Sequence, residues 1–434
     1  MPGAGLSAVG TEAGGRRVDW GFAGAYNGGS AARRGQVGRE GRGPTGGHMD
    51  CPNPDTHAVL EWPRTIQLET TSRCNLRCRM CAAKGGLSPS PRAAGARPDM
   101  PQDLYLKIIG DLGAHTEHIG QISLFMDGEP LLDRLLPERI RAAKDAGLKT
   151  VSIATNGTLL RGDTAEALLA SGLDHLIVSI DGVTPETYEA IRIGARLGDV
   201  ERNVREFRRL RNAAGRLLPQ VEVRMIVMPE NAHERDAFLE RWRHTADEVT
   251  FSPVHNWGNR LPGSGAAEVP ACNWPHRYMV VYSDGRAGFC CLDYEGVFDL
   301  GSFRTATLGE IWHGAAYARV REALAARDAR VMAKCAGCTH AALAPLAPGG
   351  WKKLLLRNPG PAPARVALAF PGEAGERKSP PRTLAPGETF SWGVPYGGQA
   401  GVDVLWDDDA PRRVHVALTP AQKYYVVAYP DAGA

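Results

Sequence analysis

The sequence from Trp62 to Phe251 alternates between short runs rich in β-branched and aliphatic residues and longer amphipathic runs. The short runs have the length and composition of strands, and the longer runs carry apolar residues at helical spacing. Such alternation requires right-handed crossovers between parallel strands. The expected strands are Thr65–Thr70, Ile119–Met126, Lys149–Ala154, His175–Ile180, Gln220–Val227 and Glu248–Phe251. The expected helices include Leu132–Ala146, Thr164–Ala170, Asp199–Ala214 and Ala232–Arg243. Six such units predict an α/β fold built on a partial (β/α)6 TIM-like barrel.

The rest of the chain divides into parts of different composition, as expected because 434 residues exceed one ordinary core. Residues 1–50 are rich in glycine and lack apolar periodicity, which predicts a disordered or non-native N-terminal extension. Within the barrel region, 62–251, the Gly/Ala/Pro/Ser-rich stretch Lys84–Pro98 predicts an inserted flexible loop. Cysteines gather again in a small domain at 252–342. Short alternating runs at 350–434 predict a small antiparallel β domain that resembles a sandwich.

Charge and hydropathy exclude several classes of protein. The 51 basic and 48 acidic residues give a formal net charge of +3, which does not favour a nucleic-acid partner. The sequence has no apolar run long enough to span a bilayer and no secretory signal, so we expect a cytoplasmic protein without a membrane partner. In a reducing compartment, the close spacing of several of the nine cysteines indicates metal ligation or catalysis rather than disulfides.

Three cysteines, Cys74, Cys78 and Cys81, lie directly after the first expected strand. Three thiolates on one loop can hold three irons of a [4Fe–4S] cluster and leave the fourth iron open to a small molecule. A structural zinc site is the alternative, but zinc in such sites takes four protein ligands. No nearby histidine or cysteine offers the fourth ligand.

The C-x3-C-x2-C spacing after a first strand resembles that of the radical SAM superfamily. The resemblance implies that a [4Fe–4S] cluster binds S-adenosyl-L-methionine and cleaves it reductively to a 5′-deoxyadenosyl radical. It also implies an electron donor of the flavodoxin or ferredoxin type.

Motifs at the ends of later strands match the same family in order. The turn Gly128-Glu129-Pro130 resembles the family's Gly-Gly-Glu-Pro motif, although Asp127 replaces the first glycine. Arg192 fits the arginine that holds the adenosylmethionine carboxylate in related enzymes, and its alternative is a solvated surface arginine. The resemblance implies cofactor-binding roles for Gly128, Glu129, Pro130, Asn156, Ser179 and Arg192.

A second constellation consists of Cys272, Cys290, Cys335 and Cys338. Four thiolates can ligate a [4Fe–4S] cluster fully or form a zinc site. Together with the Asp284-Gly285 and Leu308–Trp312 segments, this pattern resembles the SPASM/twitch auxiliary-cluster domain, which implies a second, auxiliary [4Fe–4S] cluster. Because no cysteine follows Cys338, the match is to a form with one auxiliary cluster. Three further residues, Cys51, Cys291 and His340, are expected not to be ligands.

A fully ligated cluster has no iron open to substrate, so its expected role is to accept an electron during net oxidation. We therefore expect dehydrogenation of a small metabolite such as a sugar or an aminocyclitol. Asp181, His255 and Asp293 are candidate general bases, although each could be structural. Two alternatives are a maturase that modifies a ribosomally made peptide and a non-catalytic metal- or cluster-bearing binding protein.

Iron and sulfide content tests both cysteine constellations. Anaerobically reconstituted protein should contain about eight irons per chain, because each cube holds four. The Cys74→Ala/Cys78→Ala/Cys81→Ala variant should contain about four. About four irons and one zinc in the wild type would instead indicate a structural second site.

Overall fold

The computed structural model describes part of the chain, and the predicted N-terminal extension and Cys51 lie outside the described residues. The chain separates into two units, Met1–Asp50 and Cys51–Ala434. The described residues are 59–84, 97–256, 268–340, 351–357, 363–370, 377–378, 381–384, 389–395, 401–406, 412–418 and 424–428.

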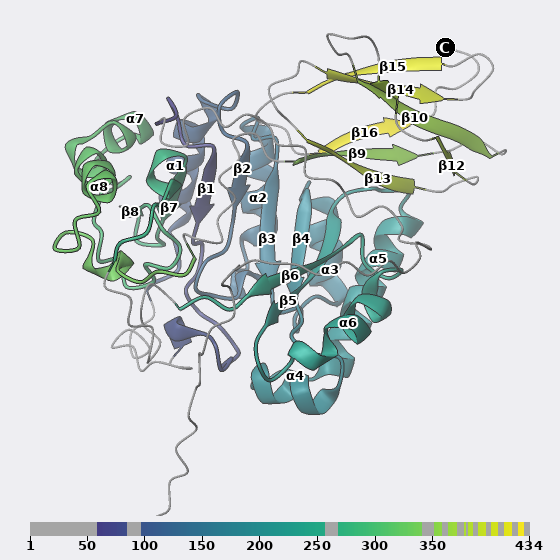
Figure 1. Ribbon diagram of the computed structural model, residues 1–434, viewed down its shortest axis with the longest axis horizontal. Helices are drawn as coiled ribbons and strands as arrows, with labels where there is room; N and C mark the ends of the chain where they lie inside the picture. Colours follow the sequence, from purple (N-terminus) through teal and green to yellow (C-terminus); the bar gives the residue numbers. More distant parts are fainter. Residues whose placement is uncertain are drawn as a thin grey trace, which may run out of the picture. The chain divides into compact units, whose positions relative to one another are not determined.

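Six parallel strands form an open sheet in chain order, which confirms the predicted partial barrel (Figure 1). They are β1 (Thr65–Leu68), β2 (Gln121–Ser123), β3 (Val151–Thr155), β4 (His175–Ser179), β5 (Gln220–Val227) and β6 (Glu248–Pro253). Strand β5 has the predicted bounds, whereas β1 and β2 are shorter than predicted. The predicted residues beyond these two strands form loops that carry the motifs.

Two further strands come from the second cysteine region and extend the same sheet. Strand β7 (Tyr278–Val281) pairs in parallel with β1, and β8 (Ala287–Gly288) pairs antiparallel with β7. The sheet therefore has eight strands, with β6 and β8 at its two ends. Buried residues of both regions, such as Ile66 and Phe303, belong to one hydrophobic core. The auxiliary region is thus built onto the barrel rather than folded separately.

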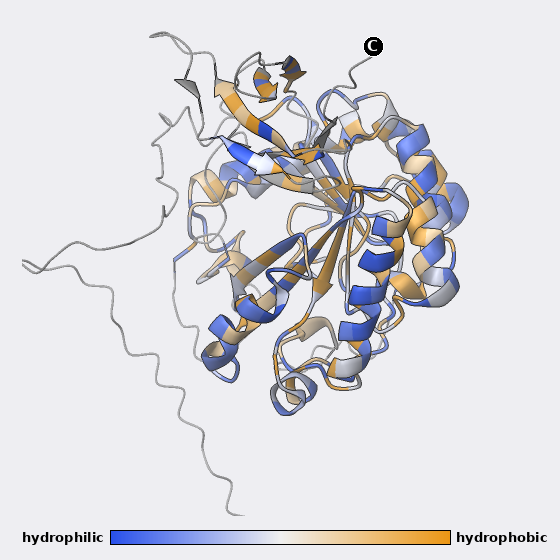
Figure 2. Ribbon diagram, turned by 90° about the vertical axis from the view of Figure 1, so that its right-hand side faces the viewer, coloured by the Kyte–Doolittle hydropathy of each residue, from blue (hydrophilic) through white to orange (hydrophobic). Residues whose placement is uncertain are grey.

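Helices cover the outer face of the six-stranded part. Figure 2 shows mainly apolar strands surrounded by helices that carry hydrophilic residues on their outer sides. These helices are α1 (Gln102–Gly113), α2 (Leu136–Asp145), α3 (Gly162–Ala170), α4 (Pro185–Ile191), α5 (Leu197–Ala213) and α6 (Arg235–Trp242). Among them, α1 was not predicted. Helix α4 starts at Thr184, whose side chain accepts a hydrogen bond from the Thr187 amide.

Short helices complete the described fold. In the auxiliary region, α7 (Leu308–Trp312) begins with a capping box between Thr307 and Glu310, and α8 (Ala315–Ala325) follows it. The 3₁₀ helices are η1 (Ala82–Lys84), η3 (Pro130–Leu132), η4 (Ala232–Glu234), η5 (Trp274–His276) and η6 (Ala333–Cys335). No helix in the described part of the chain is long and apolar enough to cross a membrane.

The described residues of the C-terminal region form two sheets. One sheet has five strands, β10 (Ala364–Phe370), β11 (Arg377–Lys378), β12 (Arg382–Leu384), β14 (Gly401–Trp406) and β15 (Arg412–Ala417). The other has three, β9 (Trp351–Arg357), β13 (Thr389–Pro395) and β16 (Tyr424–Ala428).

The two C-terminal sheets share one apolar core, in which Leu354 and Leu356 of β9 join Val366 and Leu368 of β10 and the fully buried Trp406. Trp406 is therefore a core residue. The domain is antiparallel, as predicted, except that β9 and β16 pair in parallel. Strand β9 was not predicted.

A buried carboxylate fixes the start of β6 against α5. Asp247 pairs with Arg208 and Arg211 and accepts a hydrogen bond of 2.7 Å from the Val221 amide. Burial by itself would raise the pKa of Asp247, but the hydrogen bond and charge of Arg211, with the charge of Arg208, hold it below its usual range. The ionised carboxylate is therefore part of the folded structure.

The Asp247→Asn variant should lose about 3 kcal/mol of unfolding free energy, because it leaves the buried Arg211 and the half-buried Arg208 without their charge partner. Since the folded pKa is depressed, this stabilisation is present above the unfolded pKa of about 4 and is lost as the pH falls below it. Denaturant unfolding at pH 7 and in acid measures both effects. Glu206→Gln, which breaks the exposed Glu206–Arg209 pair on α5, is the matched control and should change little. Equal effects of the two variants would contradict the prediction.

Candidate active site

The first three cysteines lie on the loop that follows β1. Cys78 is buried, while Cys74 and Cys81 are half-buried. The loop is anchored by the C-terminal end of α4, because the Arg79 amide donates a 3.0 Å hydrogen bond to the Ile191 carbonyl and the Arg77 amide donates one of 3.0 Å to the Ile193 carbonyl. Three thiol groups on one anchored loop suit the three-cornered ligation of a [4Fe–4S] cluster.

The turn at Gly128 lies against the base of this loop. A Cβ atom on Gly128 would lie 2.3 Å from the Thr71 carbonyl oxygen and 2.7 Å from that of Arg73. The Glu129 amide donates a 2.7 Å hydrogen bond to the same Arg73 carbonyl. Only glycine permits this approach of two backbones, so the glycine of the motif serves packing here.

The Glu129 side chain binds within the protein. Its carboxylate accepts hydrogen bonds of 2.6 Å from the Thr155 hydroxyl, 2.7 Å from the Asn156 amide and 3.1 Å from the Leu131 amide. Burial raises the pKa of Glu129, and these hydrogen bonds oppose the shift. The carboxylate thus joins the end of β2 to the end of β3, next to Pro130, the first residue of η3.

Asn156 joins the β3 end to the cysteine loop. Its side-chain amide donates a 2.9 Å hydrogen bond to Asn75, and Asn75 donates one of 2.9 Å to Thr158. The side-chain oxygen Oδ1 of Asn156 accepts a 3.0 Å hydrogen bond from the Thr158 amide. The predicted cofactor-binding residue is therefore also a structural link.

Arg192 lies at the cysteine loop and is only 8% exposed, so it is not a solvated surface residue. Its Nη1 atom is 3.8 Å from the Cys78 sulfur, and its Nε donates a 2.5 Å hydrogen bond to Asp181. The other Asp181 oxygen accepts a 2.7 Å hydrogen bond from the Ile226 amide. Both oxygens of this fully buried carboxylate are engaged, which indicates that Asp181 positions Arg192 rather than accepting a substrate proton. Ser179 ends β4 nearby and is half-buried.

The structure brings the second cysteine set together. Burial, and then the charges of Cys290 and Cys338, raise the pKa of Cys272 to about 12. Burial and the charges of Cys290, Cys272 and Cys338 likewise raise the pKa of Cys335. Thiolates in such surroundings need a cationic centre to ionise, so this donor set fits an iron–sulfur cluster or zinc.

The neighbouring Cys291 packs against Tyr278, Val280 and Tyr282 and forms a hydrogen bond with Cys290. Cys290 is among the groups whose charge raises the pKa of Cys272 and of Cys335. These contacts support Cys290 as the fourth member of the set.

The other two candidate bases differ in their surroundings. Asp293 is buried and accepts hydrogen bonds from the Val297 amide (3.0 Å), the Phe298 amide (2.9 Å) and Lys334 Nζ (2.5 Å), so it is structural. His255 is half-buried, and its ring centroid lies 5.4 Å from that of His340. Burial and the charge of His340 lower the pKa of His255 to about 4, which leaves its imidazole neutral at neutral pH.

The ring of His340, which was expected not to be a ligand, also packs 5.1 Å from that of Trp274. Trp257 and Gly258, which follow His255 in the sequence, lie outside the described residues.

The sheet face opposite the helix-covered core carries polar residues that sequence reasoning missed. Ligand atoms of His175, Glu222 and Glu248 lie within 4.8 Å of one another. Arg224 Nη2 is 2.6 Å from Glu222, and His175 Nε2 is 3.0 Å from it. Burial would raise the pKa of Glu222, but His175 and Arg224 lower it below its usual range. Because Arg224 already neutralises Glu222, this group forms a polar lining rather than a metal site.

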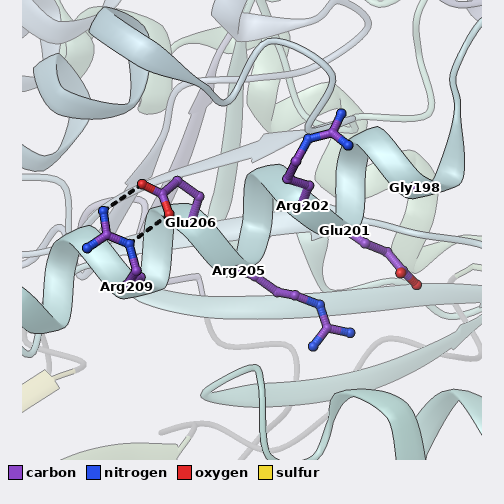
Figure 3. A pocket seen from close by; sticks show the side chains of 6 residues that line it. All are labelled: Gly198, Glu201, Arg202, Arg205, Glu206 and Arg209. Atoms are coloured by element: carbon purple, nitrogen blue, oxygen red, sulfur yellow. Dashed lines mark hydrogen bonds and ion pairs between the residues drawn. The ribbon is translucent and has the colours of Figure 1, made fainter.

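A shallow cavity of 390 Å³ lies along α5 (Figure 3). It is lined by Gly198, Glu201, Arg202, Arg205, Glu206 and Arg209. Glu206 and Arg209 pair with each other across it. The cavity contains none of the predicted site residues.

Comparison with family models gives two matches. Residues 68–241 match the radical SAM superfamily, and residues 272–339 match the SPASM iron–sulfur cluster-binding domain. The second match spans the second cysteine set.

Curated relatives match part of the chain. A GTP 3′,8-cyclase of Limosilactobacillus fermentum is 36% identical over 203 residues, which are 44% of this chain and 55% of the relative. A tungsten-containing aldehyde ferredoxin oxidoreductase cofactor-modifying protein of Pyrococcus furiosus is 31% identical over 167 residues, 38% of this chain and 44% of the relative. The chain therefore spans about half the length of these relatives.

Solved structures share the fold at low identity. Streptococcus suis SuiB bound to the precursor peptide SuiA is 13% identical, with a TM-score of 0.50 over 61% of this chain and 68% of that one. BtrN in complex with AdoMet and 2-DOIA is 19% identical, with a TM-score of 0.44 over 64% of this chain and 94% of that one.

The Gly128→Ala variant should lose iron from the first cysteine set, because a Cβ there would push the loop base away. Gly110→Ala in α1 is the matched control, since no atom lies within 4 Å of its added Cβ. The control should retain iron and gain roughly 0.5–1 kcal/mol of stability. Iron per chain after anaerobic reconstitution, with thermal unfolding of both variants, measures the effect. Equal iron in both variants would contradict the packing role of Gly128.

Proposed function

Because the chain belongs to the radical SAM superfamily and carries a C-terminal SPASM iron–sulfur domain, we propose that it dehydrogenates a small polar metabolite by cleaving S-adenosyl-L-methionine. A sugar or an aminocyclitol is the substrate class proposed. The observation that supports this proposal is the proximity of Cys272, Cys290, Cys335 and Cys338, which act on one another's pKa.

The two cysteine sets would hold two [4Fe–4S] clusters. Cys74, Cys78 and Cys81 supply three ligands to the first, and the four auxiliary cysteines supply all ligands to the second. When bound, the first cluster supplies an electron for reductive cleavage of adenosylmethionine, and the second is an electron acceptor.

Arg192 and Asp181 prepare the place for adenosylmethionine. The Asp181 carboxylate holds Nε of Arg192, which leaves other guanidinium donors for a ligand carboxylate next to Cys78. Ser179 at the end of β4 is the proposed second contact. Desolvation makes these charge-assisted hydrogen bonds stronger than they would be in water.

Dehydrogenation explains why a second, fully ligated cluster is present. The substrate carbon loses one hydrogen atom to the 5′-deoxyadenosyl radical. The neighbouring heteroatom then loses a proton, and the substrate radical loses one electron. The electron needs an acceptor and the proton needs a base. His255 is the proposed base, because its imidazole is neutral at neutral pH and a neutral imidazole can accept a proton.

The polar lining on β4–β6 supports a polar substrate. A barrel lumen filled by aliphatic side chains is the usual arrangement. Here Glu222, Arg224 and Thr250 share a hydrogen-bonded group, and the Arg224 side chain is 35% exposed. Such groups can exchange hydrogen bonds with hydroxyl or amino groups of a small metabolite.

Maturation of a ribosomally made peptide is the competing proposal. It shares the adenosylmethionine chemistry and the oxidising second cluster, and it differs only in substrate. A flavodoxin- or ferredoxin-type protein is the proposed electron donor in both cases. A non-catalytic binding protein would share neither the cleavage nor its dependence on Arg192.

Anaerobically reconstituted protein incubated with adenosylmethionine and dithionite should form 5′-deoxyadenosine. Arg192→Lys should raise the KM for adenosylmethionine about tenfold, since it loses the guanidinium fork. The Cys74→Ala/Cys78→Ala/Cys81→Ala variant should form none, whereas Cys272→Ala/Cys335→Ala should still cleave. Liquid chromatography with mass spectrometry measures the product. Lack of 5′-deoxyadenosine from the wild type would remove the enzymatic proposal.

A further inference from the structure

Arg97 forms a buried ion-pair group at the ends of β1 and β2. Its Nε and Nη2 donate hydrogen bonds of 2.5 and 2.7 Å to the two oxygens of Glu69. Nη2 also donates a 2.8 Å hydrogen bond to Asp127. The exposed fractions of these three side chains are 8% for Arg97, 0% for Glu69 and 6% for Asp127. We call Arg97, Glu69 and Asp127 the Arg97 triad.

The same guanidinium reaches the auxiliary region. Nη1 of Arg97 donates a 2.9 Å hydrogen bond to the Tyr294 carbonyl, and its guanidinium carbon lies 4.8 Å from the centre of the Tyr282 ring. The Ser283 amide donates a 3.2 Å hydrogen bond to Glu69. One buried cation therefore contacts the barrel on one side and the segment 282–294 on the other.

That auxiliary segment leads directly to the second cysteine set. The Tyr282 hydroxyl donates a 2.7 Å hydrogen bond to the Asp293 carbonyl, and the Asp293 amide donates one of 3.1 Å to the Cys290 carbonyl. The Tyr294 side chain packs with Ala82 and Ala83, next to Cys81 of the first set. A shift of segment 282–294 would therefore change the contacts around both cysteine sets.

Arg97 is also fixed to the base of the first cysteine loop. Its carbonyl accepts a 2.9 Å hydrogen bond from the Ser72 hydroxyl, and the Met100 amide donates one of 2.9 Å to the Thr70 carbonyl. The side chain of Arg97 consequently has little freedom to follow the auxiliary region if that region moves.

The triad accounts for the departure from the family motif. Asp127 stands where the resembling motif has its first glycine, and its carboxylate is the second anionic partner of Arg97. Two carboxylates around one buried guanidinium are costly to separate, because any one of them left alone is a buried unpaired charge. The added aspartate therefore tightens the contact between the Gly128 turn and Arg97.

We propose that Arg97 is a positioning residue that, through Glu69 and Asp127, fixes the auxiliary cysteine region against the adenosylmethionine-binding turn. This inference rests on the proposed function, in which both cysteine sets serve one reaction. Adenosylmethionine cleavage itself depends on Arg97 much less, since Gly128 and Glu129 keep their own contacts with the cysteine loop and β3.

The test compares Arg97→Met with Arg73→Met in the reconstituted full chain. Arg73 pairs with Asp99 at 2.6 Å. Like the Arg97–Glu69 pair, it joins residues 69–73 to residues 97–99, but it is exposed. Backbone amide hydrogen exchange of peptides covering 279–296 should become roughly tenfold faster in Arg97→Met and stay within about twofold in Arg73→Met. Asp127→Gly, which keeps the Arg97–Glu69 pair, should show a smaller acceleration in the same peptides. The Arg97→Met/Asp127→Gly double variant should show little more acceleration of exchange than Arg97→Met alone.

A spectroscopic measurement separates positioning from general stability. In the Cys74→Ala/Cys78→Ala/Cys81→Ala background, the electron paramagnetic resonance spectrum of the reduced second cluster should shift with Arg97→Met and not with Arg73→Met. Formation of 5′-deoxyadenosine by Arg97→Met in the otherwise wild-type chain should remain within about threefold of wild type.

Unchanged exchange in 279–296, or equal acceleration by Arg73→Met, would overturn the inference. If Arg97→Met does not fold, Asp127→Gly carries the same test, and no acceleration there overturns it. The proposed function fails if the wild type forms no 5′-deoxyadenosine, or if its second site gives no electron paramagnetic resonance signal after reduction. The exchange measurement still decides the role of Arg97 in that case.

Discussion

The close backbone contact between the Gly128 turn and residues 71–73 is the constraint on which the site depends. It requires a residue without a side chain at the end of β2 and brings that end to the base of the cysteine loop. Glu129 then ties the turn to β3, and Asn156 ties β3 back to the loop. Three neighbouring strand ends are thereby locked around the cysteines before any ligand binds.

The buried charges of the site act mainly through geometry. Glu129 and Asp181 are desolvated, and each satisfies its oxygens with protein donors rather than with solvent. Buried ionic groups contribute little net stability compared with apolar packing, but removing one partner is costly. They hold loops of irregular backbone in one arrangement, which apolar contacts alone would define less sharply. This is why the arrangement at the strand ends consists of carboxylates bound to amides and guanidinium groups.

Sequence patterns predicted the six barrel strands, the motif positions and both cysteine sets, because these features are local or have fixed spacing. The structural role of Glu129 could not be predicted, since its partners lie 26 and 27 residues away. The pairing of β7 with β1 joins residues more than 200 positions apart. Arg97 was part of a stretch predicted as a flexible loop, because its neighbours are glycine, alanine and proline. Arg97 is nevertheless buried and ordered, because it pairs with Glu69 and Asp127, which are distant in the sequence.

The parallel pairing of β7 with β1 also explains how two cysteine sets can serve one reaction. Strand β1 leads into the first set, and the strand beside it leads through β8 to Cys290 of the second. Their separation is therefore set by the sheet's backbone hydrogen bonds and not by a linker. The rate of electron transfer between two sites depends on the distance between them. In two separately folded domains that distance would vary. The Arg97 triad lies where both strands end, so it restrains the loops that the sheet itself does not reach.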